Sequence, residues 1–229
     1  MKSISPKPRI SIIVPILNEE PQMPFLLAHL LELQRQHCEV ILVDGGSQDN
    51  GAQIASALGF NVLKSGRGRS VQMNYGAEHA QSDFLMFLHA DTRLPENAVS
   101  IICAALETEQ WGRFDVEISG SARMFRVIAW FMNQRSRLTG IATGDQAIFI
   151  RRSLFERLQG FPAQTLMEDI ELSKRLNKIV KPVCLTDKVL TSGRRWQEKG
   201  IWRTILLMWR LRFAYWRGAS PDMLAQKYR

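Results

Sequence analysis

Residues 10–43 read ISIIVPILNEEPQMPFLLAHLLELQRQHCEVILV, and they hold two short apolar runs separated by a longer segment. The runs, residues 10–14 and 40–43, have the length and composition of strands that are buried on both faces. Between them, residues 24–36 carry apolar side chains at helical spacing. A strand, a helix and a second strand in this order predict a βαβ unit, in which the two strands run parallel.

The alternation of strand and helix continues to about Trp111 and then becomes less regular. Further strands are expected at residues 60–63, 84–88, 114–119 and 147–150. Further helices are expected at residues 50–58, 70–80, 96–107, 124–137 and 167–177. This order predicts an α/β fold with a mostly parallel sheet flanked by helices, and in such sheets ligands bind where strands end.

The 229 residues carry a net charge of +8, and the excess charge is concentrated near the C-terminus. Ten of the 30 basic residues, but only two of the 22 acidic ones, lie from Lys188 onward, which leaves 20 of each in the rest of the chain. This asymmetry argues against nucleic-acid binding and favours one localised anionic partner, either a membrane surface or a phosphorylated substrate. We expect one domain over residues 1–193, with a basic, Trp-rich helical extension over residues 194–229 packed on it.

Neither export nor a membrane span is indicated by the sequence. Residues 1–9 are polar and lack the apolar region of a secretory signal, and no stretch reaches 18 uncharged apolar residues. The three cysteines, Cys38, Cys103 and Cys184, are too widely spaced for a disulfide framework or a zinc site. We therefore expect a cytoplasmic protein, located at the inner face of the cell membrane if its tail binds lipid.

Polar side chains follow the second and third expected strands. The second strand leads into Asp44, followed by two glycines and by the helix-capping residues Ser47 and Asp49. Capping does not explain Asp44, whose carboxylate could accept hydrogen bonds from a nucleobase or ribose, or could simply serve the turn. After the third strand, Gly66-Arg67-Gly68-Arg69 opens a helix, and this loop is either a phosphate site or a solvated basic loop.

The fourth strand runs into His89-Ala90-Asp91, which places two potential metal ligands at alternate positions. An aspartate with one neighbouring donor and diphosphate oxygens holds Mg²⁺ or Mn²⁺ in many sites. The alternative is a helix-capping Asp91 and a half-buried His89. Glu168 and Asp169 could likewise only complement the dipole of the helix that they begin.

Taken in order, these motifs resemble the family-two inverting glycosyltransferases of GT-A fold. The motifs are Pro15-x-x-Asn18-Glu19, Asp44-x-x-Ser47-x-Asp49, the Gly-Arg-Gly loop with Asn74, the Asp91 strand end, Gly144-Asp145-Gln146 and Glu168-Asp169. The chain is most similar to a short bacterial subgroup, the arsenosugar-biosynthesis-type glycosyltransferases. That similarity is carried by residues 87–95, Gly144-Asp-Gln, Leu166-Met-Glu-Asp169 and Arg194-Arg195-Trp196.

The resemblance implies a metal-assisted hexosyl transfer from a nucleoside diphosphate sugar, with UDP as the expected nucleotide, to a hydroxyl acceptor. The Trp-rich, basic tail is consistent with an acceptor that is lipid-linked or amphiphilic. The resemblance also implies that the nucleotide sugar contacts Pro15, Asn18, Glu19, Asp44, Arg67 and Asn74. It implies that Asp91, with His89 where the family usually has an acidic residue, holds the Mn²⁺ or Mg²⁺. Asp169 would be the general base, and Glu168 would be the less favoured candidate for that role. The side chains of Glu168 and Glu171 are expected to point away from the acceptor. The acceptor side would be formed by Gly144, Asp145, Gln146, Arg195 and Trp196.

Two other functions compete with this one. A protein of the same fold could bind a nucleotide or a partner without catalysis, in which case Asp169 only begins a helix. A sugar nucleotidyltransferase shares the alternating architecture, but its glycine-rich loop after the first strand is missing because residues 15–20 contain no glycine. The histidines His29, His37 and His79 lack spaced partners and are expected at the surface or its boundary.

The tail, residues 200–217, has two apolar faces at about 100° per residue. One stripe holds Trp202, Ile205, Leu206, Trp209, Phe213 and Trp216, and the opposite one holds Leu207, Met208, Leu211 and Tyr215. Arg203, Arg210 and Arg217 lie along one flank and Arg212 along the other. The pattern predicts that one face packs on the body while the other enters an anionic lipid interface; a buried helix or a dimer contact is the alternative.

Overall fold

The computed structural model describes residues 7–228 and contains the expected βαβ unit. Strand β1 (Ser11–Ile16), helix α1 (Met23–Arg35) and strand β2 (Glu39–Asp44) follow one another, and β1 pairs with β2 in parallel. The other strands are β3 (Asn61–Lys64), β4 (Phe84–Phe87), β5 (Thr92–Arg93), β6 (Trp111–Ile118), β7 (Ile148–Arg151) and β8 (Val183–Thr191). The other helices are α2 (Gly51–Ala57), α3 (Arg69–His79), α4 (Ala98–Thr108), α5 (Met124–Thr139), α6 (Arg152–Arg157), α7 (Glu168–Asn177), α8 (Arg194–Lys199), α9 (Ile201–Trp216) and α10 (Pro221–Tyr228), with short 3-10 turns η1 (Glu20–Gln22) and η2 (Gly144–Gln146).

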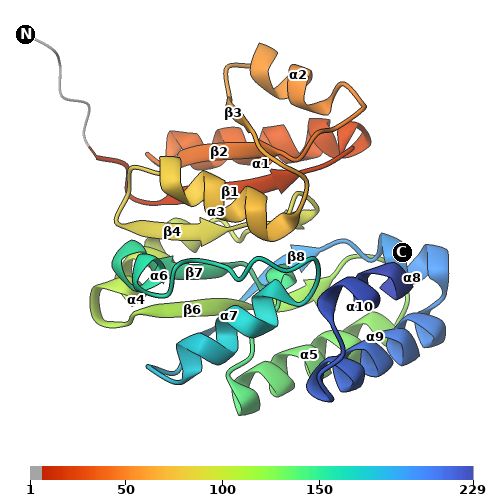
Figure 1. Cartoon of the computed structure of the whole chain (residues 1–229). Coiled ribbons are helices and arrows are strands. Elements are labelled where there is room, and N and C mark those ends of the chain that lie inside the picture. Colours follow the sequence, from red (N-terminus) through yellow and green to blue (C-terminus); the bar gives the residue numbers. More distant parts are fainter. Residues whose placement is uncertain (1–6, 229) are drawn as a thin grey trace, which may run out of the picture.

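The strands within the described residues form one sheet in the order β3-β2-β1-β4-β7-β6-β8-β5. The N-terminal half, β3 to β4, is parallel throughout, whereas β7 runs antiparallel to both β4 and β6. Helices lie on both faces of the sheet, as Figure 1 shows. The carboxyl ends of β1, β2 and β4 therefore meet at one edge, where the loops with the polar motifs begin.

The apolar runs are strands because both of their faces are buried. On β1, Ile12 and Val14 belong to a core shared with α1, α4 and α5, whereas Ile13 belongs to a second core shared with α3, α6 and α7. On β2, Leu42 and Val43 divide between the two cores in the same way. Successive residues of a strand point to opposite faces, so a strand between two helical layers must be apolar at every position.

Strand β8 has no counterpart in the sequence-based expectation. It pairs in parallel with β6, but the register shifts: Phe114 lies opposite Leu185 and the next residue, Asp115, lies opposite Lys188. The bulge leaves Thr186 and Asp187 without a partner in the register, which interrupts the alternation that identifies strands. The pairing with β6 therefore defines β8, and local pattern does not.

The expectation that His29 lies at the surface is wrong. His29 is buried, and the backbone N–H of Leu94 donates a hydrogen bond to its Nε2 at 3.1 Å. Burial, followed by the charge of Arg93, lowers the pKa of His29, which keeps the imidazole neutral and able to accept that bond. His29 thus fixes the segment that follows Asp91. His37 and His79 are exposed, as expected.

The C-terminal helices pack on the body beside the start of α7. Leu211 of α9 and Leu224 of α10 are buried together with Met167 and Ile170. The stripe of α9 that packs on the body is therefore the one that contains Leu207, Leu211 and Tyr215. Within residues 7–228, no helix is long and apolar enough to cross a membrane.

Candidate active site

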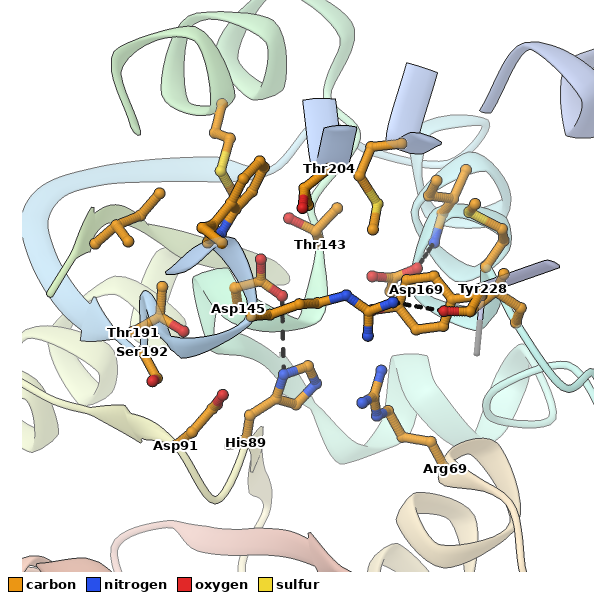
Figure 2. Close-up of a pocket in the computed structure, with 18 of the residues that line it drawn as sticks. Arg69, His89, Asp91, Thr143, Asp145, Asp169, Thr191, Ser192, Thr204 and Tyr228 are labelled. Atoms are coloured by element: carbon orange, nitrogen blue, oxygen red, sulfur yellow. Dashed lines mark hydrogen bonds and ion pairs between the residues drawn. The ribbon is translucent and has the colours of Figure 1, made fainter. Parts of the chain in front are cut away.

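A cavity of about 350 Å³ opens where the carboxyl ends of the central strands meet the C-terminal helices. Its carboxyl groups come from Glu19 after β1, Asp91 after β4, Asp145 in η2, and Glu168 and Asp169 at the start of α7. Segments far apart in the sequence therefore contribute five carboxyl groups to one space. Figure 2 shows Asp91, His89 and Asp145 on one side of this cavity and Asp169, Tyr228 and Arg69 on the other.

The loops after β1 and β2 are fastened to each other beside the cavity. The side-chain amide of Gln72, on α3, donates to the carbonyl oxygens of Ile16 and Val43 at 2.9 and 2.8 Å, and so bridges the two strand ends. Ser47 Oγ accepts from the backbone N–H of Asn18 at 2.9 Å, and Asn18 Oδ1 accepts from the N–H of Gln48 at 2.8 Å. The residues predicted at the ends of β1 and β2 thus form one connected frame. Within it, the side-chain amide oxygen of Asn18 already accepts a hydrogen bond.

Asp169 is held in one orientation by two backbone donors. Its Oδ2 accepts from the N–H of Gly144 at 2.9 Å, and its Oδ1 accepts from the N–H of Ile170 at 2.7 Å. The first of these bonds connects α7 to η2. Each carboxylate oxygen has two lone pairs, so both remain able to accept a proton or a second hydrogen bond.

Glu168 also lines the cavity, and the expectation that it faces elsewhere is wrong. Its side chain is buried, and Arg69 Nη1 lies 3.7 Å from its Oε1. Burial, followed by the adjacent charge of Asp169, raises the pKa of Glu168 to about 7, although Arg69 acts in the opposite direction. Glu171, in contrast, faces away from the cavity toward Lys174, Arg175 and Tyr215, as expected.

Asp145 lies on the same side of the cavity as Asp91 and His89 (Figure 2). Its withdrawal from bulk water, followed by the negative charges of Asp169 and Asp91, raises its pKa to about 6. His89 Nδ1 lies 3.8 Å from Asp145 Oδ1, which is longer than a hydrogen bond. These carboxylates therefore repel one another, and Arg69, which also lines the cavity, partly offsets the repulsion.

The residues around Asp91 fit a divalent cation. His89 Nε2 is buried without a hydrogen-bond partner among the described residues. Burial, followed by nearby Arg69, lowers the pKa of His89 well below its usual value, so the ring is neutral, as metal ligation requires. No three His, Cys, Asp or Glu side chains within residues 7–228 gather closely enough to hold a metal by themselves. A carboxylate, an imidazole and phosphate oxygens of a substrate would complete such a site.

Several predicted residues lie outside this cavity. Asp44 lines a separate hollow with Lys64, and its Oδ1 accepts from both the N–H and the Oγ–H of Ser47. The amide group of Asn74 makes two hydrogen bonds to the backbone of Phe161, and Gln146 is fully buried in a capping box with Thr143. Arg67 lines a third depression, beside Gln164 and Asp222, and Pro15 does not line the cavity.

Sequence reasoning missed part of the cavity wall. Arg69, the second arginine of the Gly-Arg-Gly-Arg loop, takes the place in the cavity that was expected for Arg67. Tyr228 lines the cavity from α10, and the guanidinium carbon of Arg195 lies 3.6 Å from the centre of its ring. Arg195 Nη2 also donates to the carbonyl oxygen of Tyr228 at 2.6 Å. Trp196 also lines the cavity, whereas no local pattern identifies Tyr228.

Two curated relatives share part of this sequence. The undecaprenyl-phosphate 4-deoxy-4-formamido-L-arabinose transferase of Shewanella sediminis is 30% identical over 109 residues, which cover 43% of this chain and 33% of the relative. The protein of the same name from Serratia proteamaculans is 25% identical over 170 residues, 66% of this chain and 50% of the relative. The chain thus spans half or less of the length of these relatives.

Solved structures share the fold. S. aureus TarS 1-349, in complex with UDP, superposes with a TM-score of 0.64 at 18% identity, over 80% of this chain and 60% of that one. The mannosyltransferase PcManGT of Pyrobaculum calidifontis, in complex with GDP-Man and Mn²⁺, gives a TM-score of 0.61 at 20% identity, over 97% of this chain and 69% of that one. At such identities the likeness establishes the fold alone, and that fold is the GT-A glycosyltransferase architecture.

The family itself is decided by the sequence. The family model described as glycosyl transferase family 2 matches residues 11–158, from β1 to the end of α6, which is more than half of the chain. The matched segment contains the frame at the ends of β1 and β2 together with Asp91, His89 and Asp145. This chain therefore belongs to glycosyltransferase family 2.

Proposed function

We propose that the protein transfers a hexosyl group, with inversion, from a nucleoside diphosphate sugar, UDP being the preferred nucleotide, to an acceptor hydroxyl. The observation that carries this proposal is that Asp91, which follows β4, and Asp169, at the start of α7, line one cavity. Inverting transfer requires neutralisation of the leaving diphosphate on one side of the anomeric carbon and a base on the other. The two aspartates are assigned these two roles.

On the donor side, Asp44 and Glu19 are assigned to the nucleoside and Arg69 to the phosphates. Asp91 and His89 would hold the Mn²⁺ or Mg²⁺, which, when bound, supplies positive charge to the diphosphate oxygens as the bond to the sugar breaks. The carboxyl cluster supports this assignment, because the pKa of Asp145 is raised partly by Asp91 and Asp169.

On the acceptor side, Asp169 is assigned as the general base. The acceptor oxygen forms a bond to the anomeric carbon, its proton passes to an Asp169 carboxylate oxygen, and the diphosphate leaves with the electrons of the broken carbon–oxygen bond. The N–H groups of Gly144 and Ile170 hold the carboxylate in place for this transfer. Glu168 is the alternative base, since its pKa of about 7 suits proton transfer near neutral pH.

The acceptor is proposed to be lipid-linked or amphiphilic. Two observations support this class: the curated relatives are named for transfer to undecaprenyl phosphate, and the acceptor side of the cavity combines Trp196 and Met208 with Arg195 and Arg212. Such a wall suits an apolar chain next to a phosphate. The corresponding place of action is the cytoplasmic face of a membrane. The Leu166-Met-Glu-Asp169 and Arg194-Arg195-Trp196 motifs also support the arsenosugar-type subgroup as the nearest branch of the family.

A thermal-shift panel of UDP, GDP, CDP and dTDP, each with Mn²⁺ or with EDTA, tests the donor assignment. We expect UDP with Mn²⁺ to stabilise the protein by about 2.7 kcal/mol at one hundred times its Kd, and EDTA to remove most of that effect. Asp91→Ala should lose the metal effect. Asp83→Ala is the matched control, because Asp83 is exposed and lies at the other end of β4.

The metal assignment fails if EDTA changes neither the affinity for UDP nor the turnover of the donor sugar. The catalytic proposal fails separately if the protein binds a nucleoside diphosphate but releases none from any nucleotide sugar in the presence of an acceptor. In that case the protein binds nucleotides without catalysis.

A further inference from the structure

One side of the molecule exposes large apolar side chains from two helices. On α9, Trp202, Leu206, Trp209, Phe213 and Trp216 are all exposed, between 59% and 74% of their surface. At about 100° per residue these five positions fall within roughly 80° of one another, so they form a single stripe. On α5, Val127, Trp130, Phe131 and Leu138 are exposed as well, Leu138 by 85%. We call these nine residues the apolar face.

The two stripes belong to neighbouring parts of the fold. Figure 1 draws α5 and α9 together along the same side of the molecule. Ile205 of α9 packs against the core that contains Ile128 of α5, and Met132 of α5 lines the same cavity as Met208 of α9. Four of the six tryptophans of the chain lie on the apolar face. Apolar exposure on this scale indicates a surface that binds something.

The charged side chains on the two helices of the apolar face are all positive. Neither α5 nor α9 contains an aspartate or a glutamate. Arg203, Arg210 and Arg217 lie along one flank of the α9 stripe and are exposed, and Arg212 lies along its other flank. If a second copy of this chain docked through the same two helices, their arginines would face one another, and neither helix offers a carboxylate to pair with them. Tryptophan between guanidinium groups is complementary to an interface of acyl chains and anionic headgroups.

We propose that the apolar face of α5 and α9 docks the protein onto an anionic lipid bilayer. Trp and Phe side chains enter the boundary between headgroups and acyl chains, and the flanking arginines contact lipid phosphates. Arg212 connects this surface to the cavity, because it flanks the α9 stripe and also lines the cavity. Docking therefore places the acceptor side of the cavity next to the lipid surface, where the hydroxyl of an amphiphile is available. The inference goes beyond the proposed function, since docking needs no donor sugar.

Co-sedimentation with vesicles tests the proposal. The full chain is mixed with vesicles of phosphatidylcholine and phosphatidylglycerol, or of phosphatidylcholine alone, at low and at high salt. We expect binding to the anionic vesicles that weakens with salt, together with a blue shift of tryptophan fluorescence. Trp209→Ala and Trp130→Ala should each weaken binding roughly tenfold. Phe25→Ala is the matched control, because Phe25 is 71% exposed on α1, outside the apolar face.

Charge reversal separates docking from general attraction of a basic protein. Arg210→Glu should weaken binding to anionic vesicles more than Arg35→Glu, which changes an exposed arginine at the end of α1. The proposal is overturned if the wild type does not co-sediment with anionic vesicles at low salt, or if Trp130→Ala binds like the wild type. It is also overturned if the protein dimerises without lipid and Trp209→Ala abolishes the dimer, because the face is then covered by a second copy.

Discussion

Asp169→Asn tests the proposed reaction most directly, because it removes the charge of the base and keeps its shape. The two oxygens of Asp169 accept from the N–H groups of Gly144 and Ile170. Asparagine has one side-chain oxygen, so one of these donors loses its partner, which costs about 1–3 kcal/mol. Part of this cost is offset, because the Asp169 charge also raises the pKa values of Glu168 and Asp145. We expect the variant to stay folded.

The effect on catalysis should be larger than the effect on stability. A general base contributes about 10²- to 10⁴-fold to the rate, and each factor of ten corresponds to about 1.36 kcal/mol of activation free energy. The expected increase of the barrier is therefore about 2.7–5.4 kcal/mol. Donor binding should change little, since Asp91, His89 and Arg69 are untouched.

The assay measures release of nucleoside diphosphate from the donor that the thermal-shift panel identifies, at saturating donor concentration. Calorimetry gives the Kd of the nucleotide for the same protein samples, and thermal unfolding reports whether the variant is folded. Glu171→Gln is the matched control. Glu171 lies on the same helix but faces Lys174 and Arg175, 3.6 and 3.7 Å away, outside the cavity.

A value of kcat within about tenfold of the wild type, from folded Asp169→Asn with unchanged nucleotide Kd, would refute the assignment of Asp169 as base. Glu168→Gln and Asp145→Asn then test whether either of the two carboxyl groups nearest to Asp169 takes the proton. A loss of nucleotide binding in Asp169→Asn would instead assign Asp169 to the donor side.

Three further changes have definite expected outcomes. The first is Glu168→Gln, whose unfolding free energy should rise relative to that of the wild type as the pH goes from about 5 to about 8. The reason is that a carboxyl group with a raised folded-state pKa, here about 7, loses its stabilising contribution as the pH rises through that value. If urea denaturation gives the same difference in unfolding free energy between variant and wild type at both pH values, this prediction is contradicted. Gly76→Ala should cost about 1–3 kcal/mol, since its β-carbon would lie 2.5 Å from a methyl carbon of Ile13, and an unchanged Tm would be the opposing result. Gly144→Ala would place a β-carbon on the ring of His89, so calorimetry should show Mn²⁺-dependent UDP binding weakened on the order of tenfold; full binding would remove His89 from the metal site.

The N-terminal half of the fold was predictable from the sequence because its signals are local. Each of β1, β2 and β4 is buried on both faces, and this requirement is written in consecutive apolar residues. Parallel strands bring their carboxyl ends to one edge, so Glu19 and Asp91 could be assigned to the same region from their positions after strands. Strand β8 could not be predicted, because its bulged pairing with β6 depends on a partner some 70 residues away in the sequence.

The sequence by itself determined the family, the α/β alternation, and the carboxylates and arginines from which the site is built. Only the tertiary structure decided which of them face the cavity. Met167, in the left-handed conformation with φ 65°, starts α7 so that both Glu168 and Asp169 line the cavity, and Arg69 lines it where Arg67 was expected. Likewise, the periodicity of α9 gave two apolar stripes, and the structure decided which of them is exposed and added the stripe on α5. The physical reason is that helical periodicity reports the faces of one helix, whereas the direction of a side chain depends on the elements that pack around it.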